Sequence, residues 1–382
     1  MAKSRSYFVV LIVLLMPMVL SCSKKETATD RHDRGMEAPG KTQAAFDTYN
    51  QGVEAGKNGD YDLAITCYTE AIRLDPNDAM AYSSRGSAYR KKGEFDKAIA
   101  DCTEVIRLAP NLAAAYYNRG NAYNEKGEFD KAIADYTEAI RLDPSIALAY
   151  GSRGGAYVDT GEYDRAIADC NEAIRLDPNL AMAYYNRGYA YDDMGEFDEA
   201  IADYTEAIRL DPSIALAYGS RGGAYVNKGE YDRTIADCNE AIRLDPNLAM
   251  AYYNRGCAYD DMGEHDKAIA DYNEVIRLDP KDADAYNNRG WAYIQEGVCD
   301  NGIADCSEAI RLDPKNPIAY RNRAIAHQNK GDHAKAVADF TEAIRLAPTH
   351  PDPYAGRATA YRALGDEEKA AADERKAQEL MK

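Results

Sequence analysis

The sequence predicts an all-α protein, an α-solenoid of about ten tandem helical hairpins. Two residue types that interrupt helices recur with a constant spacing of 34 residues. Apolar residues between them have helical spacing, so each interval is expected to hold two helices. The prolines stand at 76, 110, 144, 178, 212, 246, 280, 314 and 348, and the glycines stand at 59, 93, 127, 161, 195, 229, 263, 297, 331 and 365.

Residues 113–146 illustrate the first helix of one repeat. Tyr116, Gly120 and Tyr123 are spaced by four and then three residues, which places them on one face of a helix. Gly127 follows this pattern. Because glycine readily adopts the left-handed backbone conformation, Gly127 is expected to end the first helix and start a turn.

The second half of the same repeat has its own helical pattern, over residues 129–140. Pro144 cannot continue that helix, because proline lacks the backbone N–H. Ser145, like Asn179 in the next repeat, is suited to cap the first helix that follows. The repeat is therefore expected to read helix, tight turn, helix, stop.

Small residues at fixed positions indicate close packing within each hairpin. Gly120 and Ala132 let the two helices approach, since a bulky side chain at either position would separate them. The motifs Tyr-x-Asn-Arg-Gly-x-Ala-Tyr, Gly-Glu-Phe-Asp-x-Ala-Ile and Ala-Ile-Arg-Leu-Asp-Pro recur from about Ala45 to the C-terminus. This pattern resembles the tetratricopeptide-repeat family, whose period is also 34 residues. The resemblance implies a right-handed superhelical solenoid that binds other proteins.

The expected solenoid covers residues 45–382. Its last helix is polar, with Glu374 where preceding repeats have Tyr, Cys or Phe, as a terminal cap requires. The repeats are expected at 45–78, 79–112, 113–146, 147–180, 181–214, 215–248, 249–282, 283–316, 317–350 and 351–382.

The repeats alternate, so the periodic module is a pair of hairpins. Residues 147–214 and 215–282 differ at only 10 of 68 positions. A first-helix position holds Tyr in one class of repeat (Tyr117, Tyr185, Tyr253) and Ser or Gly in the other (Ser83, Gly151, Gly219). A tyrosine-bearing site is therefore expected at every second repeat. The matching core position of the second helix runs Tyr68, Cys102, Tyr136, Cys170, Tyr204, Cys238, Tyr272, Cys306 and Phe340.

The N-terminus predicts export. A basic start and an apolar run over residues 1–21 are typical of a signal peptide. The segment Val19-Leu20-Ser21-Cys22 resembles a bacterial lipobox, in which the cysteine is lipidated. Residues 22–44 are expected to tether the solenoid, and Ser23 suggests an outer-membrane lipoprotein facing the periplasm. An ordinary leader and an uncleaved membrane anchor remain alternatives.

Charge and composition argue against several classes of function, namely nucleic-acid binding, catalysis and metal binding. The net charge is −18 and the sequence shows no positive surface of the kind that nucleic acid requires, so nucleic acid is not expected as a partner. Cys102, Cys170, Cys238 and Cys306 are expected to be small buried apolar residues, because 68-residue spacing within each class of repeat forbids disulfides. No nucleophile–base pair, phosphate loop or metal-ligand cluster is recognisable. The sequence therefore predicts no enzymatic activity, no cofactor and no metal.

Polar residues that recur in each repeat are expected to be structural. Asp130 and Asp135 are expected to solvate the second helix and pair locally, and Arg119 is expected to hydrogen-bond neighbouring acids. A role repeated in every unit is not that of a catalytic group.

The resemblance implies where a partner would bind. In tetratricopeptide-repeat proteins the first helices line a concave groove that holds peptides. Tyr and Trp offer rigid contact area, and Asn can grip an extended backbone. The alternative is that the tyrosines only pack between adjacent first helices. The positions carried over are Tyr117, Asn118, Asn121, Tyr185, Asn186, Tyr189, Asp192, Tyr253, Asn254, Asp260, Asn287, Asn288, Trp291 and Arg321.

The expected function is thus a non-catalytic scaffold, tethered to the bacterial envelope only by its lipid, that binds an extended protein segment. Acidic residues such as Asp159, Asp192 and Asp260 suggest a basic or neutral segment. Two alternatives share the scaffold. One is a structural assembly factor of an envelope complex, and the other is a docking regulator of a periplasmic hydrolase. The sequence names neither the partner nor the oligomeric state.

Overall fold

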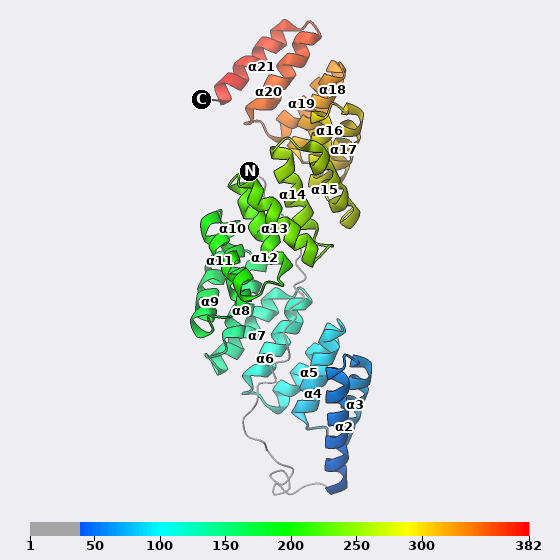
Figure 1. Cartoon of the computed structure of the whole chain (residues 1–382), viewed down its shortest axis with the longest axis vertical. Coiled ribbons are helices and arrows are strands. Elements are labelled where there is room, and N and C mark those ends of the chain that lie inside the picture. The colour runs from blue at the N-terminus through cyan, green and yellow to red at the C-terminus, as the bar shows by residue number, and fades with distance from the viewer. Residues whose placement is uncertain (1–38, 382) are drawn as a thin grey trace. The chain divides into compact units, whose positions relative to one another are not determined.

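The computed structural model describes residues 39–381 and is helical there, without strands (Figure 1). Twenty helices, α2 to α21, follow one another over that range as ten hairpins, which confirms the predicted α-solenoid of tandem repeats. They form two compact units, of which the first ends at Gly195 and the second begins at Glu196. The predicted signal peptide, Cys22 and most of the tether lie outside the described residues.

The first unit contains five first helices and four second helices. The first helices are α2 (Pro39–Lys57), α4 (Ala79–Lys91), α6 (Ala113–Glu125), α8 (Ala147–Asp159) and α10 (Ala181–Asp193). The second helices are α3 (Tyr61–Leu74), α5 (Phe95–Leu108), α7 (Phe129–Leu142) and α9 (Tyr163–Leu176).

The second unit contains the remaining helices, which continue the same alternation. Its first helices are α12 (Ala215–Asn227), α14 (Ala249–Asp261), α16 (Ala283–Gln295), α18 (Pro317–Asn329) and α20 (Pro351–Ala363). Its second helices are α11 (Phe197–Leu210), α13 (Tyr231–Leu244), α15 (His265–Leu278), α17 (Cys299–Leu312), α19 (His333–Leu346) and α21 (Glu367–Leu380).

Helix α2 begins earlier than the sequence suggested. It starts at Pro39, so residues 39–44 are helical although they were assigned to the tether. Proline is well tolerated in the first turn of a helix, where its missing N–H has no intrahelical partner.

The turn inside each hairpin is built as the glycine spacing predicted. Gly127 has a φ of +80°, in the left-handed region. The N–H of Glu128 donates to the carbonyl of Tyr123 at 2.9 Å, and the N–H of Gly127 donates to the carbonyl of Asn124 at 2.9 Å. This pair of bonds is the Schellman motif, which satisfies the last carbonyls of the first helix.

The loop between hairpins differs from the prediction that Ser145 and Asn179 cap the following helices. The N-cap of α8 is Ile146, which makes no side-chain cap bond. Ser145 instead donates its backbone N–H (3.0 Å) and its hydroxyl (2.6 Å) to Asp143 Oδ1. Asn179 likewise donates its N–H to Asp177. The aspartate before the proline therefore organises this loop as an Asx turn.

Close packing within the hairpins depends on glycine, as predicted. A Cβ added at Gly120 would lie 2.8 Å from the ring of Tyr136, and a Cβ added at Gly154 would lie 2.7 Å from Cys170 Sγ. Whether the core residue of the second helix is Tyr or Cys, the facing position of the first helix must therefore be glycine, which has no side chain. The four predicted core cysteines are buried, and burial raises the pKa of the Cys102 thiol to about 12.

Gly256→Ala should lower the free energy of unfolding by about 1–2 kcal/mol, since its Cβ would lie 2.9 Å from the Tyr272 ring and overpack the core. Better helix propensity offsets part of that cost. Gly56→Ala is the matched control, because its nearest neighbour would be 3.8 Å away. Chemical denaturation should show the control unchanged or stabilised. Equal stability of both variants would contradict the role of glycine in close packing.

Buried ion pairs join the two helices of most hairpins, and they correct the expectation that Asp135 solvates its helix. Asp135 is only 6% exposed, and Arg119 Nε and Nη2 each donate to its carboxylate at 2.8 Å. Arg119 Nη1 also donates to Thr103 on the preceding hairpin at 3.2 Å. Arg119 thus pairs with an acid, as expected, and ties adjacent hairpins together. Equivalent pairs are Arg85–Asp101, Arg153–Asp169, Arg221–Asp237, Arg255–Asp271, Arg289–Asp305, Arg323–Asp339 and Arg357–Asp373.

The last helix, α21, has the polar character of a cap. It buries Ala370, Asp373 and Ala377 on one face. Glu374 stands where earlier repeats place a core side chain, but its side chain is 44% exposed and pairs with Arg362 at 2.6 Å. The outer face of α21 is therefore suited to water.

Candidate functional site

The candidate site is the side of the first helices that carries the fourteen residues predicted for the groove, called here the first-helix face. Three of them are buried in the protein. Tyr185 is 4% exposed, Asn186 is 9% exposed and Asn287 is 5% exposed. The ring of Tyr185 packs against that of Tyr189 on the same helix, α10, with centroids 6.4 Å apart. A tyrosine-bearing contact surface at every second repeat therefore does not extend to Tyr185.

Two asparagines of the face hold adjacent first helices together. Asn186 Nδ2 on α10 donates to the carbonyl of Gly151 on α8 at 3.1 Å. In the second unit Asn254 Nδ2 on α14 donates to the carbonyl of Gly219 on α12, also at 3.1 Å. A side chain at Gly155, on the same helix as Gly151, would block the approach of Asn186. A Cβ added at Gly155 would lie 2.9 Å from Asn186 Nδ2. These asparagine contacts join the first helices of two successive hairpins, and they give a physical reason why the repeating module is a pair of hairpins.

In the first unit, several side chains of the first-helix face contact other residues of the protein itself. The ring of Tyr117 packs on that of Tyr136, with centroids 5.9 Å apart. Tyr136 donates its hydroxyl to Asn121 Oδ1 at 2.8 Å. Asn118 on α6 and Tyr189 on α10 are both half-buried. Asn121 thus keeps its amide nitrogen for a ligand, while its oxygen is occupied.

An ion pair that was not predicted crosses the same region. Arg90 on α4 pairs with Glu125 on α6, and their side chains are 17% and 19% exposed. Burial raises the pKa of the Glu125 carboxyl above its usual value, although Arg90 opposes this shift. Arg90 and Glu125 are 35 positions apart, which is one repeat plus one residue. A basic and an acidic residue at that spacing were the sequence signal from which this ion pair could have been predicted.

In the second unit, amide groups form a hydrogen-bonded chain over three successive first helices. Asn322 Nδ2 on α18 donates to Asn287 Oδ1 on α16 at 3.0 Å. Asn287 Nδ2 donates to the neighbouring Asn288 at 3.1 Å, and Asn288 Nδ2 donates to the hydroxyl of Tyr253 on α14 at 3.0 Å. Such a chain fixes the rotamers of Asn288 and Tyr253 before any ligand arrives.

An aromatic–cationic pair lies next to this chain. The guanidinium carbon of Arg321 lies 6.0 Å from the centroid of the Trp291 ring. Arg321 Nη1 also donates to Asp352 on α20 at 3.2 Å. Both Trp291 and Arg321 are half-buried, so each keeps part of its surface in solvent. Trp and Arg are the side chains most enriched at energetically important positions of protein interfaces.

The predicted acidic residues lie at the C-terminal ends of the first helices. Asp260 contacts His265 Nδ1 at 2.8 Å, and burial raises the pKa of its carboxyl. Asp193 accepts a hydrogen bond from Tyr163. Asp192 is half-buried, whereas Asp159 and Asp261 are exposed. The acidic charge is thus concentrated near the turns.

Comparison with known families decides the assignment. Sequence models described as tetratricopeptide repeats match residues 49–113, 113–146, 154–195, 181–214, 222–263, 249–282, 271–301 and 317–350, which together cover more than half of the chain. The chain belongs to the tetratricopeptide-repeat family.

Solved structures of tetratricopeptide-repeat proteins are similar to this one. A protein from Parabacteroides merdae aligns with a TM-score of 0.53 at 20% identity, over 65% of this chain and 98% of its own, which supports the shared fold. MamA aligns at 31% identity over 42% of this chain and 94% of its own, with a TM-score of 0.39. YrrB, described as having an unusual peptide-binding site, aligns at 24% identity over 48% of this chain and 95% of its own, with a TM-score of 0.41.

Two further features of this tetratricopeptide-repeat protein concern metal sites and membrane spans. Within residues 39–381, no three His, Cys, Asp or Glu side chains are grouped so that they could hold a metal ion. Over the same range, no helix has both the length and the apolar character needed to cross a membrane. The family is typically non-catalytic and acts through protein–protein interaction.

Proposed function

We propose that this protein is a non-catalytic scaffold that binds an extended segment of a partner protein along the first-helix face. The observation that carries the proposal is the fixed group Tyr253, Asn288, Trp291 and Arg321 on three successive first helices. Its aromatic rings offer contact area to an extended segment, and the Asn288 amide, which bonds both Asn287 and Tyr253, holds the Tyr253 ring in place. Because the rotamers are already held, little conformational entropy is lost on binding.

The partner segment is proposed to be basic or neutral. The chain carries a net charge of −18, so a basic segment is attracted over long range. Arg321, the cation of the group, is already paired with Asp352 and does not reverse that sign. Nucleic acid is not a proposed partner, because the charge opposes it.

Trp291→Ala should weaken binding of such a segment by about tenfold or more, since truncating an aromatic residue at the centre of an interface costs about 2 kcal/mol or more. Gln295 is exposed and follows Trp291 by four residues, so a photo-crosslinking residue there reports on the same helix face. Crosslinking in the native cell identifies the partner, and a peptide from it can then be titrated. Trp291 is the chain's single tryptophan, so its emission in the wild-type protein reports binding directly.

The matched control compares two arginines. Arg321→Ala removes the guanidinium that packs over the Trp291 ring, whereas Arg345→Ala removes an exposed side chain that pairs with Glu342 on the second helix α19. Binding should fall only in the Arg321 variant. Equal binding by Trp291→Ala, Arg321→Ala and the wild type would exclude the first-helix face as the site.

We further propose that the protein is exported and held by an acylated Cys22, in the outer membrane facing the periplasm. The support is the lipobox-like sequence alone. Cys22→Ser should move the protein from the membrane fraction to the soluble fraction, because a single lipid-bearing residue would supply the anchor. Cys67→Ser, which alters a buried thiol, is the control and should not change fractionation. Retention of the Cys22→Ser protein in the membrane would favour an uncleaved anchor.

A further inference from the structure

The turns of several hairpins are joined to the preceding hairpin by a lysine. Lys126 Nζ lies 2.7 Å from Asp96 Oδ1, at the start of the preceding second helix, and 2.7 Å from Glu128 Oε1. The lysine follows its aspartate by 30 residues. This contact between a turn and the preceding second helix is called here the seam. The same lysine–aspartate contact occurs as Lys92–Asp62, Lys228–Asp198 and Lys330–Asp300.

The lysine is absent at five seams, where its position holds Thr160, Met194, Met262, Glu296 or Leu364, and a surface depression lies at the two seams that carry methionine. Met194 and Met262 occupy the lysine position, and each is 42% exposed. The corresponding acids, Asp164 and Asp232, are exposed, and neither pairs with a cation among residues 39–381. The first depression is lined by Gly161, Glu162, Tyr163, Asp164, Arg165 and Met194, and the second is lined by Gly229, Glu230, Tyr231, Asp232, Arg233 and Met262.

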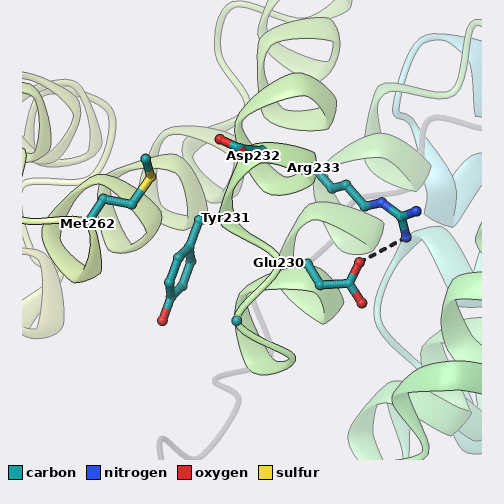
Figure 2. Close-up of a pocket in the computed structure, with 6 residues that line it drawn as sticks. Glu230, Tyr231, Asp232, Arg233 and Met262 are labelled. Atoms are coloured by element: carbon teal, nitrogen blue, oxygen red, sulfur yellow. Dashed lines mark hydrogen bonds and ion pairs between the residues drawn. The ribbon is translucent and has the colours of Figure 1, made fainter.

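The charges around the second depression leave one acid without compensation. Arg233 Nη1 pairs with Glu230 at 2.8 Å, so these two groups neutralise each other. The negative charge of Asp261 raises the pKa of the Tyr231 hydroxyl, which keeps that group neutral. Figure 2 shows the Tyr231 ring and the Met262 side chain facing each other, with the Glu230–Arg233 pair to one side. The Asp232 carboxylate therefore has no cation partner within the second depression, and the nearby charge of Asp261 adds to the negative potential there.

The first depression repeats this arrangement. Arg165 pairs with Glu162 at 2.6 Å, and Tyr163 donates its hydroxyl to Asp193 at 2.5 Å. Asp164 is again the acid that no cation balances. The two depressions occur at equivalent positions of the two-hairpin module, in different units of the chain.

We propose that each depression receives a lysine side chain of a basic partner segment, in the place that the chain's own lysine fills at four other seams. The carboxylate of Asp164 or Asp232 would pair with the ammonium group, as Asp96 does with Lys126. The methionine thioether and the tyrosine ring would pack along the lysine's methylene groups. The depressions lie at the turns rather than on the first-helix face, so this inference does not depend on the proposed function.

The test titrates the full-length protein with an acetylated Lys-Gly-Gly-Lys peptide at low ionic strength, with methionine methyl groups labelled for NMR. The methyl signals of Met194 and Met262 should shift. Met80 and Met381, which are 55% and 65% exposed, should not. The same peptide with norleucine in place of lysine should leave all four unchanged. Equal shifts with both peptides, or shifts at all four methionines, would overturn the proposal.

Two variants locate the contact. Asp232→Asn should weaken the Met262 response about twofold to fivefold, the range of an exposed ion pair, while Asp198→Asn, whose acid is already paired with Lys228, should not. Met262→Lys should abolish the shifts of the amides of residues 229–233 and leave Met194 responsive, because the chain then fills its own depression. Full binding by Met262→Lys would contradict the assignment. If Trp291 emission changes while both methionines stay silent, the peptide binds the first-helix face and the depressions are not its site.

Discussion

Asp135→Ala should lower the free energy of unfolding of the first unit by about 3–5 kcal/mol. The substitution leaves Arg119 with a guanidinium that is only 20% exposed and has lost two charge-assisted hydrogen bonds. Removing one partner of a buried ion pair costs this much because the other charge remains buried without compensation. Urea denaturation followed by circular dichroism gives the free energy, and hydrogen exchange shows whether the loss is confined to α6 and α7.

Two further variants separate the buried pair from general effects of charge. Asp130→Ala removes an exposed carboxylate from the same helix and should change stability by less than about 0.5 kcal/mol. Arg119→Met combined with Asp135→Leu should recover most of the loss, since a well-packed apolar pair can replace a buried ion pair. If Asp135→Ala and Asp130→Ala were equally stable, Asp135 would not have the role assigned to it.

Tyr272→Ala should destabilise the second unit by about 3–5 kcal/mol. The Tyr272 side chain is 1% exposed. Its ring packs edge-on against that of Tyr253, with centroids 6.1 Å apart, and Gly256 has no side chain that would collide with it. Truncating a buried aromatic residue removes its transfer free energy and leaves a cavity. The change in denaturation midpoint measures the effect.

Tyr272→Phe is the matched control, and the chain itself supplies the precedent. Phe340 occupies the same position in a later repeat and is also 1% exposed. The Tyr272 hydroxyl makes only a long contact with Cys257 Sγ, at 3.5 Å. Its removal should therefore cost about 1 kcal/mol or less. A loss as large as that of the alanine variant would mean that the hydroxyl, not the ring, determines stability here.

The fold was predictable because two kinds of residue act locally. Gly127 ends a helix through its own backbone conformation, and Pro144 stops one through its missing N–H, whatever the rest of the chain does. Ser145 was mistaken for a cap because its neighbour Asp143 competes for the same loop hydrogen bonds. Asp135 was mistaken for a solvated residue because only the packed hairpin shows that its partner lies 16 residues earlier in the chain.

The candidate site was less predictable, since exposure depends on how closely neighbouring first helices approach. Tyr117 and Tyr185 occupy the same position of the repeat, yet Tyr185 is 4% exposed and Tyr117 is half-buried. The position four residues later holds Tyr189 in one repeat and Asn121 in the other, and the Tyr189 ring packs against Tyr185. The seam depressions were also missed, although the exchange of lysine for methionine at 194 and 262 was visible in the sequence.

Where a hairpin has the buried ion pair, its arginine reaches back only to the hairpin before it, as Arg119 does to Thr103. The residue contacted there is always Thr, Asn or Ser, so a small polar acceptor recurs in the same order along the repeats. Deletion or duplication of one 68-residue block would therefore rejoin matching surfaces, and the new neighbours would form the contacts that the old ones had. Copy number is then free to vary during evolution without a new core, and unequal recombination between the near-identical blocks offers a route to chains of different length.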